Sequence, residues 1–218
     1  MPLDHIAQSA VQLSFIPPRE ELDIFSDGHH VLAFSRVEWN FVVKILKEEN
    51  DPLLLRRHIE ALDHLKGLVA DFQILKENEK ILVIQEKIHC LLDEKLRQKV
   101  SEGKLIEAKK LVEEYINLNI CLWNRGYFDW HFRIDHCGVG TGERLLLFDI
   151  GGIRGRPTLT ERIKWRFGFF GRRHMKNGEI LQNIHPELSV LYHQSAARQL
   201  TLNVAEEAIF SYYSGKKR

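Results

Sequence analysis

The sequence of 218 residues has few cysteines and no long hydrophobic run. Its three cysteines, Cys90, Cys121 and Cys137, form neither an even set nor a Cys-x-x-Cys pair, which favours a reducing compartment. The longest apolar runs, such as 145–148, are far shorter than the roughly 20 residues that cross a bilayer, and no charged and then apolar leader opens the sequence. We therefore expect a cytoplasmic protein without a transmembrane segment.

Several sequence motifs of well-known enzyme classes are also missing. The chain has no GxSxG nucleophile elbow, no P-loop and no Rossmann glycine fingerprint. Its 31 basic and 30 acidic residues give a net charge of +1, so overall electrostatics do not point to nucleic acid. With 44% hydrophobic residues, a chain of this length can bury a core without disulfides or metal.

The first third of the sequence favours strands with one helix. Short apolar runs at 22–46, separated by the Asp27-Gly28 turn, predict two or three antiparallel strands. Asp51-Pro52, with apolar residues at helical spacing after it, predicts a helix at about 52–66. Two further runs, 68–75 and 80–88, predict a hairpin.

The remainder favours helices with one short strand pair. A broad apolar stripe predicts a helix at 104–125 that stops at Gly126. A capping box at Thr158 begins another helix, and a helical region covers about 186–213. We therefore predict an α+β protein in two lobes, a strand-rich lobe at 1–88 and a helical lobe at 89–218.

The order of these elements resembles the protein-kinase-like fold across residues 22–155. Lys44 in the strand FVVKIL stands at the position of the kinase lysine, which implies that it holds the phosphates of ATP. Glu60, in the expected helix, is the best match for the glutamate that orients this lysine, and Asp63 is the second choice.

The segment LLLFDIGG resembles the kinase Asp-Phe-Gly segment, which implies that Asp149 binds a Mg²⁺ ion bridging the phosphates. In the register that leaves the usual 18 residues to Asp149, His131 stands at the catalytic aspartate and His136 at the metal-binding asparagine. A slip of one turn instead makes Asp129 the base that accepts the substrate proton. Both registers remain open.

Two departures from the kinase pattern stand out. The glycine loop that covers the phosphates is reduced to Gly28, and only 66 residues follow Gly152, too few for the complete helical lobe. This abbreviated layout resembles the short bacterial kinase-like proteins of the PhoP-regulatory-network type.

Two other groups of residues suggest binding sites. The segment from Arg154 to Lys176 contains eight basic residues and several aromatics but a single acid, Glu161. This segment either binds an anionic partner or forms a solvated face. The run from Asp129 to Cys137 contains carboxylate, imidazole and thiolate groups, but its spacing matches no zinc motif.

Two functions follow from the resemblance. The first is a phosphotransferase that moves the γ-phosphoryl group of ATP to a protein or small-molecule hydroxyl, supported by Lys44, Glu60 and Asp149. The second is a pseudokinase that acts as a binding or regulatory module, supported by the reduced glycine loop and by His131 and His136 in the catalytic loop.

Overall fold

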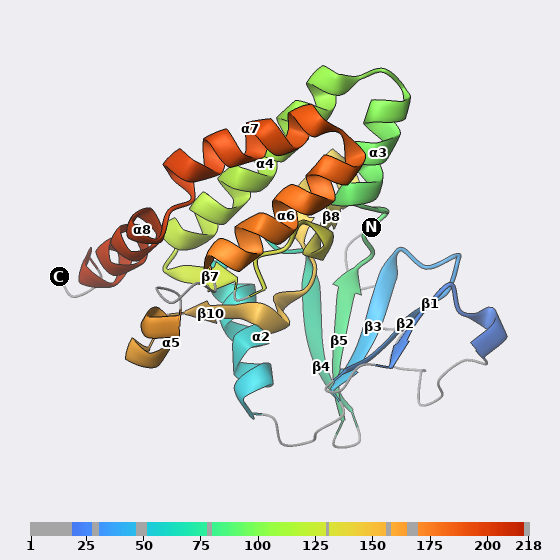
Figure 1. The fold of residues 1–218 in the computed structure, drawn as a ribbon. Helices are drawn as coiled ribbons and strands as arrows, with labels where there is room; N and C mark the ends of the chain where they lie inside the picture. Colours follow the sequence, from blue (N-terminus) through green and yellow to red (C-terminus); the bar gives the residue numbers. More distant parts are fainter. Residues whose placement is uncertain are drawn as a thin grey trace. The chain divides into compact units, whose positions relative to one another are not determined.

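The computed structural model (Figure 1) describes residues 19–27, 31–46, 52–77, 80–129, 131–155, 158–164 and 170–215. The predicted turn residue Gly28 and the aromatic residues Trp165, Phe167 and Phe169 lie outside these ranges. The described chain divides into two compact units: one comprises the residues up to Leu55 together with Ala70–Lys87, and the other comprises Arg56–Val69 and everything from Ile88 onward. The predicted lobe boundary after residue 88 stays a prediction.

The first unit contains a five-stranded antiparallel sheet. Its strand order is β1-β2-β3-β5-β4. The strands are β1 (Ile24–Asp27), β2 (Val31–Ser35), β3 (Phe41–Leu46), β4 (Phe72–Glu77) and β5 (Lys80–Glu86).

One face of this sheet carries the core of the unit. Phe41 and Val43 of β3 are buried with Phe34, Leu82 and Ile84. Because side chains alternate between the two faces of a strand, these apolar residues at every second position of β3 share one face. The apolar runs that predict the strands therefore also supply the core.

Helix α2 (Pro52–His64) confirms the helix expected at 52–66, but the hairpin after it begins later than the sequence predicts. The carbonyl oxygen of Leu68 accepts a hydrogen bond from the N–H of Leu147 at 2.9 Å, and Val69 forms a parallel bridge with Leu147. Residues 68 and 69 are thus bound within the second unit, and the hairpin starts at Phe72.

The second unit is mainly helical. It contains α3 (Leu92–Ser101), α4 (Leu105–Asn124), α5 (Leu159–Lys164), α6 (Phe170–Ile184), α7 (Pro186–Gln199) and α8 (Leu202–Gly215). Helix α7 packs against both α4 and α6 (Figure 1). Trp123 and Tyr115 of α4 and Tyr192 of α7 are among the largest fully buried side chains, so the apolar stripe of α4 forms the centre of this unit.

Short strands and single-turn helices connect α4 to α5. Strands β6 (Cys90–Leu91), β8 (Cys137–Val139) and β9 (Leu145–Leu147) form one small sheet, and β7 (Tyr127–Asp129) pairs with β10 (Ile153–Gly155). The single-turn helices of this stretch are η2 (Ile134–His136), η3 (Thr141–Glu143) and η4 (Ile150–Gly152), whereas η1 (Arg19–Glu21) precedes β1 in the first unit.

Gly126 ends α4, as predicted. Its φ of +83° lies in the left-handed region that glycine adopts without strain. A Cβ atom there would lie 2.3 Å from the ring of Tyr212 in α8, so the position excludes a side chain on two grounds. The turn therefore fixes both the end of α4 and the packing of α8.

The predicted α+β fold, strand-rich at first and helical afterwards, is confirmed. Within the described ranges, no helix combines the length and the apolar character needed to cross a membrane. The three cysteines are free thiols.

Candidate metal and phosphotransfer site

The candidate site is formed by the loop after β7 and by the residues that follow β9. Antiparallel pairing of β8 with β9 places Cys137 opposite Leu147. The N–H of Phe148 donates a hydrogen bond to the carbonyl oxygen of His136 at 3.2 Å. Asp149 follows directly, and the hairpin thereby brings it beside His136 although they lie 13 residues apart.

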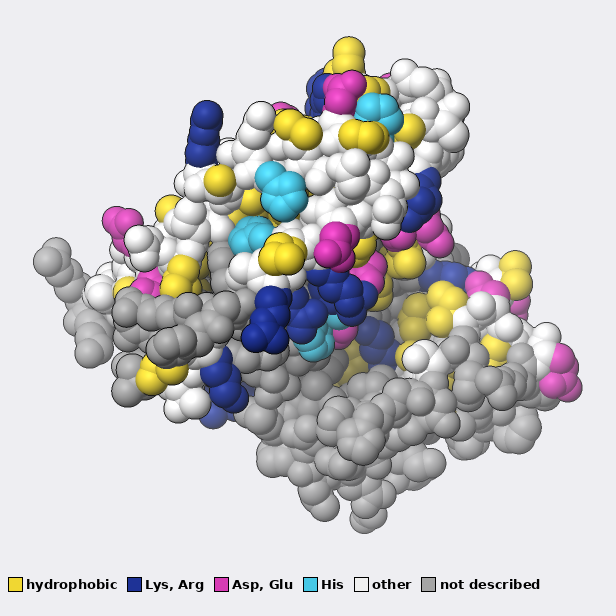
Figure 2. Space-filling view, viewed as in Figure 1, with side chains coloured by type: hydrophobic (Ala, Val, Ile, Leu, Met, Phe, Trp, Pro, Cys, Tyr) yellow, Lys and Arg dark blue, Asp and Glu magenta, His cyan; other side chains and the backbone are white. Residues whose placement is uncertain are grey.

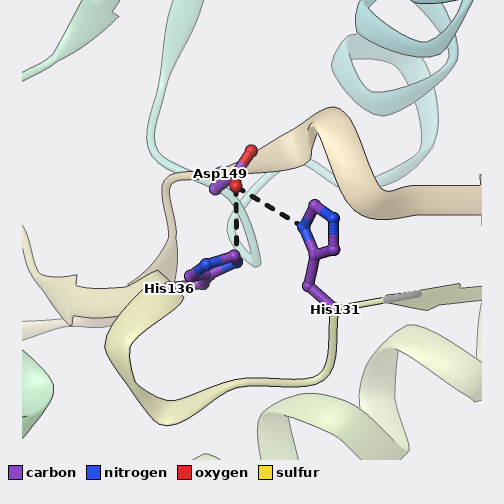
Figure 3. A group of neighbouring side chains, drawn as sticks. All are labelled: His131, His136 and Asp149. Carbon is purple, nitrogen blue, oxygen red and sulfur yellow. Dashed lines mark ion pairs between the residues drawn. The ribbon is translucent and has the colours of Figure 1, made fainter. Parts of the chain in front are cut away.

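His131 and His136 both point toward the carboxylate of Asp149 (Figure 3). The Nδ1 atom of His131 lies 3.5 Å from Asp149 Oδ2, and Nδ1 of His136 lies 3.3 Å from the same oxygen. One potential ligand atom from each residue lies within 4.8 Å of the other two. The structure therefore brings three potential metal ligands together.

The pKa values of the two imidazoles are shifted in opposite directions. The Asp149 carboxylate raises the pKa of His131, although burial and the Arg173 cation oppose this shift. Burial lowers the pKa of His136, although the Asp149 carboxylate opposes that shift. At neutral pH His136 is consequently neutral, which is the form of histidine that binds metals.

Asp129, the alternative base, is buried and holds the loop. Its Oδ1 accepts the N–H of His131 at 2.8 Å and its Oδ2 accepts the N–H of Phe132 at 2.9 Å. Burial raises the pKa of Asp129 to about 6, and these two hydrogen bonds oppose the rise. Both carboxylate oxygens thus orient the backbone that carries His131.

Gly152 closes the loop from the other side. A Cβ atom at Gly152 would lie 2.5 Å from Asp129 Oδ1 and 2.8 Å from His131 Nδ1. Because real Cβ atoms do not approach so closely, any side chain here would displace the carboxylate or the imidazole. The second glycine after Asp149 is therefore required by close approach to the site.

A buried asparagine of α6, which the sequence did not single out, anchors the same loop. Asn177 Oδ1 accepts the N–H of Ile134 at 3.2 Å, and Asn177 Nδ2 donates to the carbonyl oxygen of Phe132 at 3.0 Å. The same amide nitrogen lies within hydrogen-bond distance of the hydroxyls of Tyr115 (3.1 Å) and Tyr192 (3.2 Å), which share its second hydrogen. Phe132 has a φ of +42°, an uncommon value for a residue with a side chain, and Asn177 bonds to the backbone that directly follows this angle.

His174 extends this network away from the site. Its Nδ1 lies 2.8 Å from the Tyr192 hydroxyl and its Nε2 lies 2.9 Å from the carbonyl oxygen of Leu200. A carbonyl oxygen only accepts, so Nε2 carries the proton and Nδ1 accepts from Tyr192. Burial lowers the pKa of His174 to about 4, so this histidine is neutral and structural.

The remaining predicted residues lie in different units. Lys44 is half-buried in β3 of the first unit, whereas Glu60 belongs to α2 in the second. Arg56 Nε donates to Glu60 Oε1 at 2.8 Å, and both residues line a cavity of about 270 Å³ with Tyr127. The predicted pairing of Lys44 with Glu60 stays a prediction.

The predicted basic segment begins beyond β10 and continues into α6. Arg172 and Lys176 of α6 are exposed, and Lys and Arg side chains gather around the first half of this helix (Figure 2). Arg173 is close enough to His131 to lower its pKa. Cationic groups of α6 therefore lie next to the candidate site.

Comparison with known proteins gives limited information. No family model and no curated protein matches the sequence. Among solved structures, that of WbdD matches with a TM-score of 0.45 and 15% identity, covering 91% of this chain and 51% of WbdD. A complex of WbdD with a kinase inhibitor matches with a TM-score of 0.44 and 16% identity, covering 84% of this chain and 45% of WbdD. This chain thus spans about half of the length of WbdD in both structures. The expected likeness to the PhoP-regulatory-network type stays a prediction.

Proposed function

We propose that the protein is a kinase-like phosphotransferase, which moves the γ-phosphoryl group of ATP to a hydroxyl of a protein or small molecule. Lys44 would contact the phosphates and Glu60 would orient Lys44. His136 and Asp149 would hold a divalent cation, which neutralises phosphate charge, and His131 would face the acceptor. The exposed cations of α6, Arg172 and Lys176, would attract an anionic acceptor.

The cluster of His131, His136 and Asp149 carries this proposal. Their side chains lie together, with Nδ1–Oδ2 distances of 3.5 Å for His131 and 3.3 Å for His136. A loop held by Asp129 and by Asn177 keeps both imidazoles in position. Phosphoryl transfer depends mainly on positioning and charge neutralisation, and a rigid cation site next to basic side chains supplies both.

A transfer assay with labelled ATP tests the proposal. We expect Lys44→Met and Asp149→Ala each to reduce phosphoryl transfer at least about 100-fold. Lys44→Met removes the cation that would contact the phosphates, and Asp149→Ala removes a ligand of the divalent cation that would neutralise their charge. Glu113→Gln, at an exposed position of α4, is the matched control and should transfer at the wild-type rate. Wild-type rates in Lys44→Met or Asp149→Ala would refute the mechanism.

A second function, that of a pseudokinase, is favoured by the position of Asp129. Both oxygens of this buried carboxylate accept backbone N–H groups, which leaves it poorly placed to accept a proton from a substrate. His131 then occupies the catalytic position without a carboxylate beside the acceptor. A chain of this kind would bind nucleotide or a partner and transfer nothing.

Thermal unfolding separates the two functions when it is combined with the transfer assay. Nucleotide that binds the native state raises the midpoint of unfolding whether or not transfer follows. A rise with ATP and a divalent cation, without labelled product for any acceptor, would identify a nucleotide-sensing pseudokinase. A labelled product that disappears in Asp149→Ala would identify the phosphotransferase.

A further inference from the structure

We infer that His131, His136 and Asp149 form a site that selects a divalent transition-metal ion, such as Mn²⁺, Co²⁺ or Zn²⁺, over Mg²⁺. This inference rests on the proposed function and deepens it, because it concerns the same site. It replaces the Mg²⁺ ion that the kinase resemblance implies, and it makes His131 a ligand of the ion in place of a group that faces the acceptor.

The chemistry of the donors carries the first step. Mg²⁺ is a hard ion that takes oxygen ligands in octahedral geometry and keeps most of its water. Imidazole nitrogens instead suit zinc, iron, nickel and copper, and carboxylates are shared by both groups of metals. Two imidazoles and one carboxylate therefore fit Mg²⁺ poorly and fit a transition metal well.

The distances between the donors carry the second step. A metal that binds nitrogen and oxygen at about 2.0–2.1 Å in tetrahedral geometry separates neighbouring ligand atoms by roughly 3.3 Å. The Nδ1–Oδ2 distances of 3.5 Å for His131 and 3.3 Å for His136 are close to this value. They are also long for hydrogen bonds between nitrogen and oxygen. The three side chains are spaced as ligands of a shared ion.

The state of the two nitrogen atoms carries the third step. Nδ1 of His131 and Nδ1 of His136 are buried atoms that make no hydrogen bond. Buried polar atoms nearly always have a partner, and an unpaired atom in a native protein calls for an explanation such as an ion. Both unpaired atoms face the same carboxylate oxygen, so one ion would satisfy both.

The surroundings of the site carry the fourth step. Asp129 holds the backbone of His131, and Asn177 holds the backbone at Phe132 and Ile134. Such outer contacts fix the orientation of metal ligands and increase affinity. The side chain of Asp149 is 38% exposed, so an ion can reach the site and retain positions for water or phosphate.

The test uses the full chain, treated with a chelator and titrated with Co²⁺ in the absence of nucleotide. Visible absorption of Co²⁺ reports nitrogen ligation, and we expect one ion per chain. Mg²⁺ in about 100-fold excess should not displace it, because the site has a single oxygen donor. Displacement by an equal concentration of Mg²⁺, or the absence of Co²⁺ binding, would overturn the inference.

Single variants identify the ligands. We expect His131→Asn, His136→Asn and Asp149→Asn each to weaken Co²⁺ binding at least roughly 100-fold. His89→Asn is the matched control, because His89 is an exposed histidine of the same unit, and it should bind as the wild type does. An equal loss in the control, or wild-type affinity in all three site variants, would refute the assignment.

The wild-type protein provides a readout that does not depend on the folding of variants. In the Co²⁺ form, two imidazoles bound through Nδ1 give two shifted proton resonances from Nε2–H, and both should disappear in D₂O. Fewer than two would contradict the ligand set. Co²⁺ binding without phosphoryl transfer would refute the proposed function alone, whereas transfer supported by Mg²⁺ without Co²⁺ binding would refute this inference alone.

Discussion

Two clusters of polar side chains lie within the same helical unit, and they differ in how completely their atoms are paired. Around Asn177, the side-chain amide is bonded to the backbone of Phe132 and Ile134 and to two tyrosine hydroxyls. Around Asp149, two imidazole nitrogens are buried without a hydrogen bond. The first cluster holds segments of the chain together, whereas the second contains the two unpaired nitrogens that the proposed metal ion would bind.

This difference in hydrogen bonding distinguishes a cluster that stabilises the fold from a cluster that is a candidate for binding. A satisfied buried network stabilises a protein, and removal of one member leaves the others unpaired. An unsatisfied cluster costs stability and persists where it serves binding or catalysis. Substitution in the Asn177 cluster should therefore lower the stability of the fold, whereas substitution of Asp149 should leave stability almost unchanged.

The largest effect is expected at Asn177. Asn177→Ala removes the partners of the Ile134 N–H and the Phe132 carbonyl, and the free energy of unfolding should fall by about 3 kcal/mol in urea denaturation. Asn183→Ala, at an exposed position of the same helix, should change it by less than about 0.5 kcal/mol. Equal losses in the two variants would remove the distinction between the clusters.

His174 gives the same cluster a pH dependence. Its pKa is about 4 in the folded protein and near 6.5 when unfolded, so below pH 6.5 the unfolded chain binds a proton that the folded chain excludes. Stability should therefore fall as the pH falls, by about 2 kcal/mol from pH 7 to pH 5 for this group.

Urea denaturation at both pH values checks this expectation. His174→Phe should be less stable at pH 7 but should lose less on acidification than the wild type. His89→Gln, which replaces an exposed histidine, should keep the wild-type dependence. A wild-type dependence in His174→Phe would show that other groups cause the acid sensitivity.

Gly152→Ala tests how closely the second cluster is packed. The added Cβ would lie 2.8 Å from His131 Nδ1, so we expect the imidazole to shift and Co²⁺ affinity to fall roughly threefold to tenfold. Gly171→Ala meets no atom within 4 Å and should bind Co²⁺ normally. Unchanged affinity in Gly152→Ala would mean that the loop adapts freely.

The smallest effect on stability is expected at Asp149. Asp149→Asn should change the free energy of unfolding by less than about 0.5 kcal/mol, although we expect it to weaken binding of the proposed metal ion. Asp129→Ala should lose about 2 kcal/mol, because two backbone N–H groups lose their acceptor. A large loss in Asp149→Asn would assign Asp149 a structural role.

The sequence predicts the local features of this fold better than the distant ones. The stripe of α4, its stop at Gly126 and the spacing from His131 to Asp149 are local patterns, and the structure contains them. Asn177 was missed because its partner Ile134 lies 43 residues away, and because Asn-Gly in a sequence is typical of a turn. Tertiary packing instead keeps Asn177-Gly178 inside α6.

The boundaries of strands also depend on distant partners. Residues 68 and 69 have the apolar character of a strand, yet Leu68 and Val69 bond with Leu147 instead of continuing the hairpin. No pattern within the segment distinguishes these two pairings. The pairing of Lys44 with Glu60 likewise depends on chain segments far apart and stays a prediction.

The tyrosines of α8 affect the order in which parts of the chain can fold during its synthesis. The ring of Tyr212 lies against Gly126 just before β7, and Tyr213 and Tyr127 both lie against Gly155 at the end of β10. The ribbon that presents Asp129 is therefore clamped by residues synthesised about 80 positions later. A nascent chain still tethered to the ribosome before α8 emerges would carry its histidines without the clamp, so the proposed metal site would assemble only after translation has passed this helix.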